Sequence, residues 1–149
     1  MNFIGIAGSR CDQRQKMADQ ITSAAREMGG GPRRMICHAL YDPKPRHATS
    51  EKMRADRVRE LIEDMVGMKF DGCVFSQVYT ESEAAVIREH GGVIWHLQGQ
   101  PSDQVMIRRG DLMITLTPGG DRHYVDAIEA LSEIDLQEQR AHRRERMTA

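Results

Sequence analysis

A glycine and several polar residues follow the first apolar run of the chain, in the place that a phosphate-binding loop would occupy. The segment Gly8-Ser9-Arg10-Cys11-Asp12-Gln13-Arg14-Gln15 lies between a predicted strand and a predicted helix. A phosphate-binding loop uses glycines so that backbone N–H groups wrap the phosphates, a lysine for the outer phosphates, and a serine or threonine for magnesium. With Gly8 aligned to the first glycine of that motif, Gln13 replaces the second glycine, Arg14 the lysine and Gln15 the hydroxyl residue. Only Gly8 matches.

Each replacement weakens a particular interaction. Arg14 supplies a cation, but its guanidinium is larger than an ammonium and fits a narrow loop less well. Gln13 adopts a positive φ less readily than glycine, at a cost of about 1 kcal/mol or more. Gln15 is a poor magnesium ligand beside a hydroxyl or a carboxylate. Losing one group that stabilises the charge of the transition state raises the reaction barrier by roughly 3–4 kcal/mol. Because several such groups are replaced here, we expect no efficient phosphoryl transfer.

Further residues could take part in chemistry at the same end of the molecule. Arg108 and Arg109 follow a polar segment and could cover an anion like a lid, or form an ordinary exposed pair before a turn. His96 flanks a strand end, so it could contact a ligand or be a half-buried structural histidine. No histidine spacing typical of zinc sites occurs, and no metal site is predicted.

Three carboxylates and three thiols complete the candidates. Glu81, Glu83 and Asp103 could offer a base, although capping and the helix dipole already explain the first two. Three cysteines at wide spacing form neither a disulfide framework nor a zinc pattern, so reduced thiols are expected. Cys11, at a helix start, could also be a reactive thiol.

Composition places the chain among folded single-domain proteins. Of 149 residues, 40% are hydrophobic and 29% charged, which is enough apolar material for a core. A net charge of -1 excludes a protein that grips a phosphate backbone mainly by bulk charge. No apolar run approaches the roughly 18 residues of a membrane span, and no leader pattern opens the chain. We therefore expect a soluble, cytoplasmic protein.

Short apolar runs alternate with amphipathic segments, which predicts an α/β fold. The predicted strands are 2–8, 33–41, 71–78, 93–97 and 112–116, and the predicted helices are 12–28, 51–66, 81–90 and a last one from Asp121. Thr80 and Glu83 form a capping box, and Asp12 with Gln15 resembles one. Charged residues of the second helix, among them Arg54, are assigned to a solvated face. This order predicts a three-layer sandwich with a mostly parallel five-stranded sheet flanked by helices.

The predicted sheet also indicates where a ligand would bind and where the domain ends. Ligands of such sheets bind at the carboxyl ends of the strands, here residues 7–11, 76–80, 97–102 and 115–119. One domain is expected over 1–136, with a basic tail over 137–149. The tail has four arginines and two glutamates, so its charge is +2 against -3 for the rest. We interpret it as a frayed helix end or as a basic arm that contacts an acidic partner.

Two segments, DGCVFSQVYTESEAAVIREHGGVIWHL (71–97) and DLMITLTPGGDRHYVDAIEALSEI (111–134), resemble the deoxynucleoside monophosphate kinases typical of bacteriophages. The positions that fit are Glu83-Ala84, Ile87-Arg88, Gly91-Gly92, Asp111 and Ile114. The resemblance implies a P-loop kinase fold and phosphate transfer from ATP to a deoxynucleoside monophosphate with magnesium. The family's Asp-Val-Arg-like turn is replaced by Gln77-Val78-Tyr79 here.

Four functions remain open at this point. The leading hypothesis is a non-catalytic binding or regulatory protein on a kinase-like scaffold, which engages a host or phage protein or holds a nucleotide along residues 8–15. The alternative is an active, divergent kinase that uses ATP and magnesium, with Arg14, Arg108 and Arg109 in catalytic roles. A third is a nucleotide enzyme or sensor on another Rossmann-like sheet, with Gly8 and Ser9 at the phosphate. A fourth is a phage structural subunit, because fold does not determine function.

The resemblance and the composition also bear on partners and location. Kinases of the resembled family often pair, so a homodimer is one expected state. Neither a membrane nor a nucleic acid is expected as a partner, because the chain lacks an apolar span and has few, scattered aromatic residues. If a phage encodes the chain, the expected location is the cytoplasm of the host cell.

Overall fold

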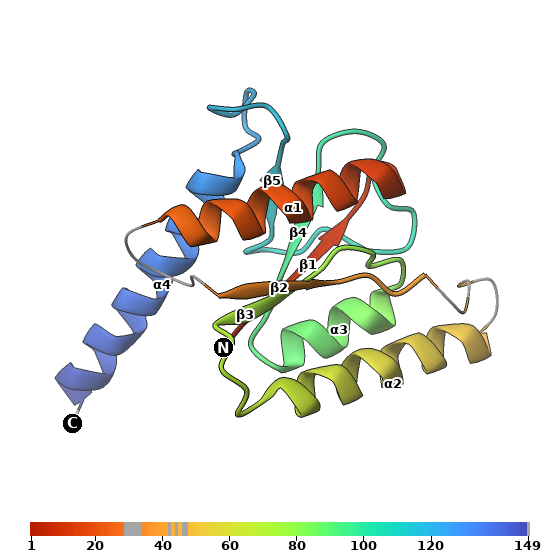
Figure 1. Ribbon diagram of the computed structural model, residues 1–149, viewed down its shortest axis with the longest axis horizontal. Coiled ribbons are helices and arrows are strands. Elements are labelled where there is room, and N and C mark those ends of the chain that lie inside the picture. The colour runs from red at the N-terminus through yellow and green to blue at the C-terminus, as the bar shows by residue number, and fades with distance from the viewer. Residues whose placement is uncertain (29–33, 42, 44, 46–47, 149) are drawn as a thin grey trace.

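The computed structural model describes residues 1–28, 34–41, 43, 45 and 48–148 (Figure 1). The elements are β1 (Asn2–Ala7), α1 (Cys11–Glu27), β2 (Met35–His38), α2 (Ala48–Met65), β3 (Gly72–Phe75), α3 (Glu81–Glu89), β4 (Val93–Leu97), β5 (Leu112–Ile114) and α4 (Ala127–Thr148). The strands form one sheet in the order β2-β3-β1-β4-β5, and every neighbouring pair is parallel. The predicted α/β class and five-stranded parallel sheet are confirmed.

Helices cover both faces of the sheet, which makes three layers (Figure 1). Strand β1 lies in the centre, and its successive side chains point to opposite faces. Ile4 and Ile6 pack with α1 and α4 in one core, while Phe3 packs with α2 and α3 in the other. Because both faces are covered, β1 is apolar at nearly every position. The carboxyl ends of the strands meet at one edge of this sandwich.

Several element boundaries differ from those predicted. Helix α2 begins at Ala48, so residues 48–50, expected as loop, form its first turn. Strand β2 covers Met35–His38 and is shorter than the predicted 33–41. Helix α1 ends at Glu27 with Met28 as its C-cap. Gly29, Gly30, Gly31 and Pro32 follow it, a sequence that predicts a helix end, but they lie outside the described residues, as do 42, 44, 46 and 47 in the connection before α2.

The largest boundary error concerns the last helix, which begins at Ala127 and not at Asp121. Val125, predicted on the helix's apolar face, instead donates its N–H to Met113 O at 2.9 Å, and its own carbonyl accepts the Thr115 N–H. It therefore extends the sheet beside β5. Asp126 then starts the helix, because its Oδ1 accepts the Glu129 N–H at 2.9 Å.

One of the two predicted capping boxes is confirmed in its N-cap half, while the Glu83 carboxylate bonds to Arg54 and to the Thr80 hydroxyl. Thr80 is the N-cap of α3, and its hydroxyl accepts the Glu83 N–H at 3.3 Å. The box proposed for α1 is wrong, because its N-cap is Arg10, which makes no side-chain cap bond. Asp12 lies within the first turn, and the Gln15 amide bonds to Asp19.

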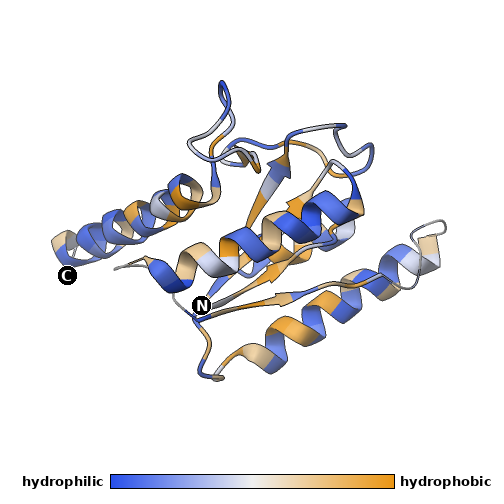
Figure 2. Ribbon diagram, turned by 45° about the horizontal axis from the view of Figure 1, so that its top comes forward, coloured by the Kyte–Doolittle hydropathy of each residue, from blue (hydrophilic) through white to orange (hydrophobic). Residues whose placement is uncertain are grey.

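The basic tail continues α4 as far as Thr148, and residues 136–148 are all exposed. Figure 2 shows most of this half of the helix as hydrophilic. Within the described part of the chain, no helix has the length and apolar character that crossing a membrane requires.

The three cysteines are predicted to differ strongly in reactivity. Cys11 and Cys37 are exposed, whereas Cys73 is buried in β3, and burial raises the pKa of its thiol to about 12. Because the thiolate is the nucleophile, Cys73 should react with Ellman's reagent about a thousandfold more slowly than an unperturbed thiol near pH 8. Two thiols should titrate quickly in the native protein and the third only after unfolding. Three equally fast thiols would contradict the burial of β3.

Candidate functional site

The connection between β1 and α1 contains only Gly8, Ser9 and Arg10. Gly8 and Ser9 have positive φ values of 83° and 58°. Ser9 is therefore in a conformation that is uncommon for a residue with a Cβ. The carbonyls of these two residues face the guanidinium of Arg14, whose Nη1 donates to Gly8 O at 3.0 Å and to Ser9 O at 2.9 Å. Arg14 is buried, with 5% of its surface exposed.

This loop has the polarity of a cation site, because carbonyl oxygens converge on the positive guanidinium. A phosphate loop needs the opposite arrangement, with N–H groups pointing inward. The Ser9 N–H is already bonded to Gln100 O at 2.7 Å, from the loop that follows β4. Gln13, expected to be strained at a glycine position, lies in the first turn of α1 and has no positive φ. The strain falls on Ser9 instead, because α1 begins two residues before Gln13.

The Gln77-Val78-Tyr79 turn completes the shell around Arg14. The Nε of Arg14 donates to Gln77 Oε1 at 2.9 Å, and the Tyr79 hydroxyl donates to the same oxygen at 3.2 Å. The Gln77 amide donates to Cys11 O at 3.2 Å. Gln77, which stands in the family's Asp-Val-Arg-like turn, thus joins the end of β3 to the start of α1.

A second buried guanidinium lies on the other side of this turn. Arg54, predicted on the solvated face of α2, is in fact fully buried, and that prediction is wrong. Its Nε and Nη2 donate to the Glu83 carboxylate at 2.7 and 3.1 Å. The same guanidinium also donates to the carbonyls of Leu40, Pro43 and Gln77. Thr80 donates its hydroxyl to Glu83 Oε1 at 3.0 Å, so both charged groups are surrounded by partners.

The ring of Tyr79 contacts both guanidinium groups. The guanidinium carbons of Arg14 and Arg54 lie 4.7 and 5.1 Å from its centroid, a distance typical of cation–π contacts. Burial raises the pKa of the Tyr79 phenol. Two arginines near the edge predicted to bind a ligand are therefore held by backbone carbonyls, an amide, a carboxylate and an aromatic ring.

A cleft remains at the carboxyl ends of β1 and β4, in two adjoining hollows. The polar hollow, of about 280 Å³, is lined by Ser9, Arg14 and Tyr79 among others. The apolar hollow, of about 220 Å³, is lined by His96 and by Leu97, Val105, Met106, Met113 and Tyr124. The two share the walls Gly8, Pro101, Ser102 and Asp103. The cleft thus lies beside three of the four strand ends predicted to bind a ligand, and the fourth, 115–119, contributes no wall to it.

His96 is held at the rim of the cleft by a chain of ion pairs. It is 5% exposed, more buried than expected, and its Nε2 lies 2.8 Å from Asp111 Oδ2. Arg88 pairs with that carboxylate at 2.7 Å and with Glu81 at 3.2 Å. Arg108 also pairs with Glu81, at 2.8 Å. The chain joins α3 to the long loop between β4 and β5.

The remaining candidates from the sequence lie away from the cleft. Arg108 faces α3, and Arg109 is exposed in a turn, so neither lines either hollow. The other predicted cofactor-binding residues are exposed or half-buried at the N-cap and on the first turns of α1: Arg10 and Asp12, paired at 3.4 Å, together with Cys11, Gln13 and Gln15. Only Gly8, Ser9 and Arg14 of the predicted set line the cleft. Sequence reasoning missed Met113 and Tyr124 as wall residues, whereas Tyr79 lies in the predicted strand end 76–80.

The site does not fit the ATP and magnesium that the kinase resemblance implies. The Arg14 guanidinium fills the inside of the loop, and the Ser9 N–H is already paired. Nowhere in the described ranges do three histidine, cysteine or acidic residues gather in a way that could hold a metal ion.

Comparisons with known proteins found no match for this chain, so the function has to be inferred from the geometry of the site. No protein-family model matches the chain, no curated protein is significantly similar to it in sequence, and no solved structure matches it.

Proposed function

We propose that this chain is a non-catalytic binding protein on a P-loop-kinase-like fold, with a cleft that holds a nucleoside or a nucleoside monophosphate. The observation that carries the proposal is the pair of bonds from Arg14 to the carbonyls of Gly8 and Ser9. They place a positive side chain of the protein itself where the outer phosphates of a bound triphosphate would lie. The resemblance to bacteriophage kinases and a cytoplasmic location belong to the same proposal.

Displacing Arg14 would be energetically unfavourable. Its guanidinium makes three hydrogen bonds, to Gly8, Ser9 and Gln77, and hydrogen bonds to charged groups contribute about 1.5–3 kcal/mol each. A triphosphate would have to break them before it could enter the loop, and would leave carbonyl oxygens facing its own negative charge. This opposes binding of ATP with magnesium.

The shape and charge of the cleft support a small ligand with little charge. Arg14 and Asp103 are the cation and the carboxylate among the residues that line its hollows. Leu97, Met113 and Tyr124 offer apolar walls for a base or sugar. The Arg14 guanidinium already donates three hydrogen bonds within the protein. Its remaining positive charge suits a neutral group or one phosphate far better than the charge of a triphosphate.

The strand order supports the kinase-like scaffold over another nucleotide-binding sheet. The order β2-β3-β1-β4-β5 differs from the 3-2-1-4-5-6 order of dinucleotide-binding folds and from the 2-1-3-4-5 order of flavodoxin-like folds. It is the arrangement expected of a P-loop kinase.

An active, divergent kinase is the second candidate, because Arg14 does line the cleft. Thermal unfolding with nucleosides, monophosphates, and ATP with and without magnesium separates the two. Under our proposal a nucleoside or monophosphate at about a hundred times its Kd raises Tm by about 5–10 °C. Magnesium makes no difference, ATP gives no comparable rise, and Tyr124→Leu removes the shift.

A phosphoryl-transfer assay is the matching control. Turnover at about 1–100 s⁻¹, the range of ordinary kinases, that is lost in Arg14→Ala would establish the alternative. No rise in Tm with any nucleoside or nucleotide at millimolar concentration would show that the cleft does not bind this class of ligand.

A further inference from the structure

Helix α4 contains a long surface that nothing in the described chain covers. Its inner side packs on the domain through Ala127, Ala130, Leu131 and Ile134. The helix has 22 residues and is about 33 Å long. In Figure 1 its C-terminal half extends beyond the sheet. The exposed part, residues 136–148, is short enough that an isolated helix of its length would be marginal in water, so a covering partner would stabilise it.

The outer face of α4 changes charge at its midpoint. Leu136, 44% exposed, lies in the middle of this face. Glu129 lies seven residues before it and Arg143 seven residues after it, which is close to two turns in each direction. Glu133 and Arg140 flank the leucine on the same side. The half before Leu136 is therefore acidic and the half after it basic.

These charges have no partners within the described chain. None of Glu129, Glu133, Arg140 and Arg143 takes part in an ion pair among the residues that the structure describes. Arg140 lies three and four residues before Arg143 and Arg144, and like charges at this spacing destabilise a helix. Opposite charges supplied from outside would remove that repulsion.

We infer that the outer face of α4 is an interface with a second copy of this chain, in which the two α4 helices pack antiparallel about Leu136. Leu136 then contacts Leu136 of the other copy on the two-fold axis. Glu129 of each copy faces Arg143 of the other, because both lie seven residues from the axis. This is an isologous contact, which closes at two copies.

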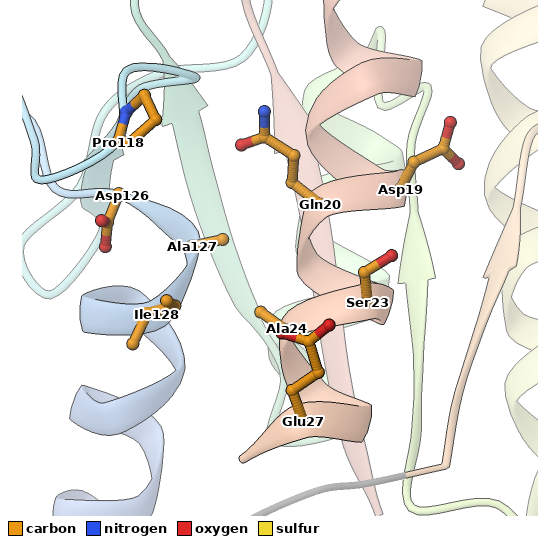
Figure 3. A pocket seen from close by; sticks show the side chains of 9 residues that line it. All are labelled: Asp19, Gln20, Ser23, Ala24, Glu27, Pro118, Asp126, Ala127 and Ile128. Atoms are coloured by element: carbon orange, nitrogen blue, oxygen red, sulfur yellow. The ribbon is translucent and has the colours of Figure 1, made fainter.

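An acidic groove lies beside the start of α4, next to the proposed interface. It has a volume of about 380 Å³ and lies between α1 and α4 (Figure 3), where Ala127 points toward α1 and the exposed Ile128 lies at its edge. Asp19, Glu27 and Asp126 make it acidic. In the antiparallel packing Arg144 and Arg146 of the second copy lie opposite Ile128 and Asp126.

A second copy fits this face better than a polyanion does. A nucleic acid or acidic membrane would be attracted to Arg140 and Arg143 but repelled by Glu129 and Glu133 on the same face. A second copy in antiparallel orientation places its basic half opposite the acidic half of the first helix, and its acidic half opposite the basic one. The inference is independent of the cleft and of the function proposed for it.

Sedimentation equilibrium of charge-reversal variants tests the interface. At about 100 µM protein and about 50 mM NaCl we expect the wild type to have twice its 16.9 kDa mass. Glu129→Arg and Arg143→Glu should each raise the dimer Kd at least tenfold, because each places like charges opposite one another twice. An equimolar mixture of the two variants should form heterodimers about as tightly as the wild type, because both pairs are then restored.

Glu138→Arg is the matched control, since it makes the same charge change on the opposite side of the helix and should leave the mass unchanged. Circular dichroism confirms that each variant is folded. A wild type that stays monomeric, a mixture that does not recover the dimer, or a control as disruptive as the test variants would overturn the inference. Binding of a DNA duplex by a monomeric wild type would overturn it in favour of a polyanion.

Discussion

Replacing Arg54 with methionine is expected to lower the free energy of unfolding by about 3–5 kcal/mol. The guanidinium and the carboxylate of Glu83 are both almost fully buried, and they are bonded at 2.7 Å. Methionine removes the charge but keeps most of the length of the side chain. Glu83 then stays buried without its counterion, and the carbonyls of Leu40, Pro43 and Gln77 lose their donor. Urea denaturation of the two proteins measures the difference.

Two further variants make this prediction specific. Arg57→Met changes an exposed arginine on the same helix and should alter stability by no more than about 0.5 kcal/mol. Adding Glu83→Gln to Arg54→Met should recover a large part of the loss, because the unpaired charge is gone. A loss below about 1 kcal/mol in the single variant would mean that the pair is not buried as described.

Arg14→Met is expected to lower the free energy of unfolding by about 2–4 kcal/mol, because three hydrogen bonds from a charged donor are removed. Whether this substitution lowers or raises the free energy of unfolding distinguishes a structural arginine from one that is kept to bind phosphate. An arginine kept to hold a phosphate has no such internal partners, so its removal from the ligand-free protein would leave stability unchanged or raise it. The measurement is again urea denaturation, without ligand.

Arg10→Met is the control for Arg14→Met, since Arg10 lies in the same loop but is exposed and, among the residues that the structure describes, paired only with Asp12. It should shift stability by no more than about 0.5 kcal/mol. If Arg14→Met unfolds at the same urea concentration as the wild type, Arg14 is not a structural residue of the loop.

Local sequence patterns were sufficient for the elements of the sheet and for one helix start. Val93–Leu97 matches its prediction residue for residue, because a β-branched and aromatic run between Gly92 and a turn has few alternatives. Thr80 forms the predicted N-cap for a similar reason, since its bond to the Glu83 N–H is local. The start of α4 was not predictable in this way. Val125 pairs with β5, which depends on a partner strand and not on helical spacing.

The burial of Arg14 and Arg54 was indicated by their positions on the apolar faces of their helices, although their charge suggests exposure. Arg54 lies four residues before Val58, and Arg14 lies three before Met17, so both are on the apolar faces of their helices. An arginine at such a position can be buried if carbonyls and carboxylates surround its head group. Those partners come from distant segments, such as Gln77 and Glu83, which only the folded structure brings together. The inward-facing carbonyls of Gly8 and Ser9 depend likewise on the contact with Gln100.

The most direct test of the central claim is a crystal structure of the protein soaked with ATP and magnesium. The claim is that the Arg14 guanidinium, and not a phosphate, fills the loop between β1 and α1. We predict that Arg14 keeps its bonds to the carbonyls of Gly8 and Ser9, with no ordered triphosphate or metal ion inside the loop. Ordered density for a triphosphate and magnesium in that loop, with Arg14 displaced toward solvent, would contradict the account.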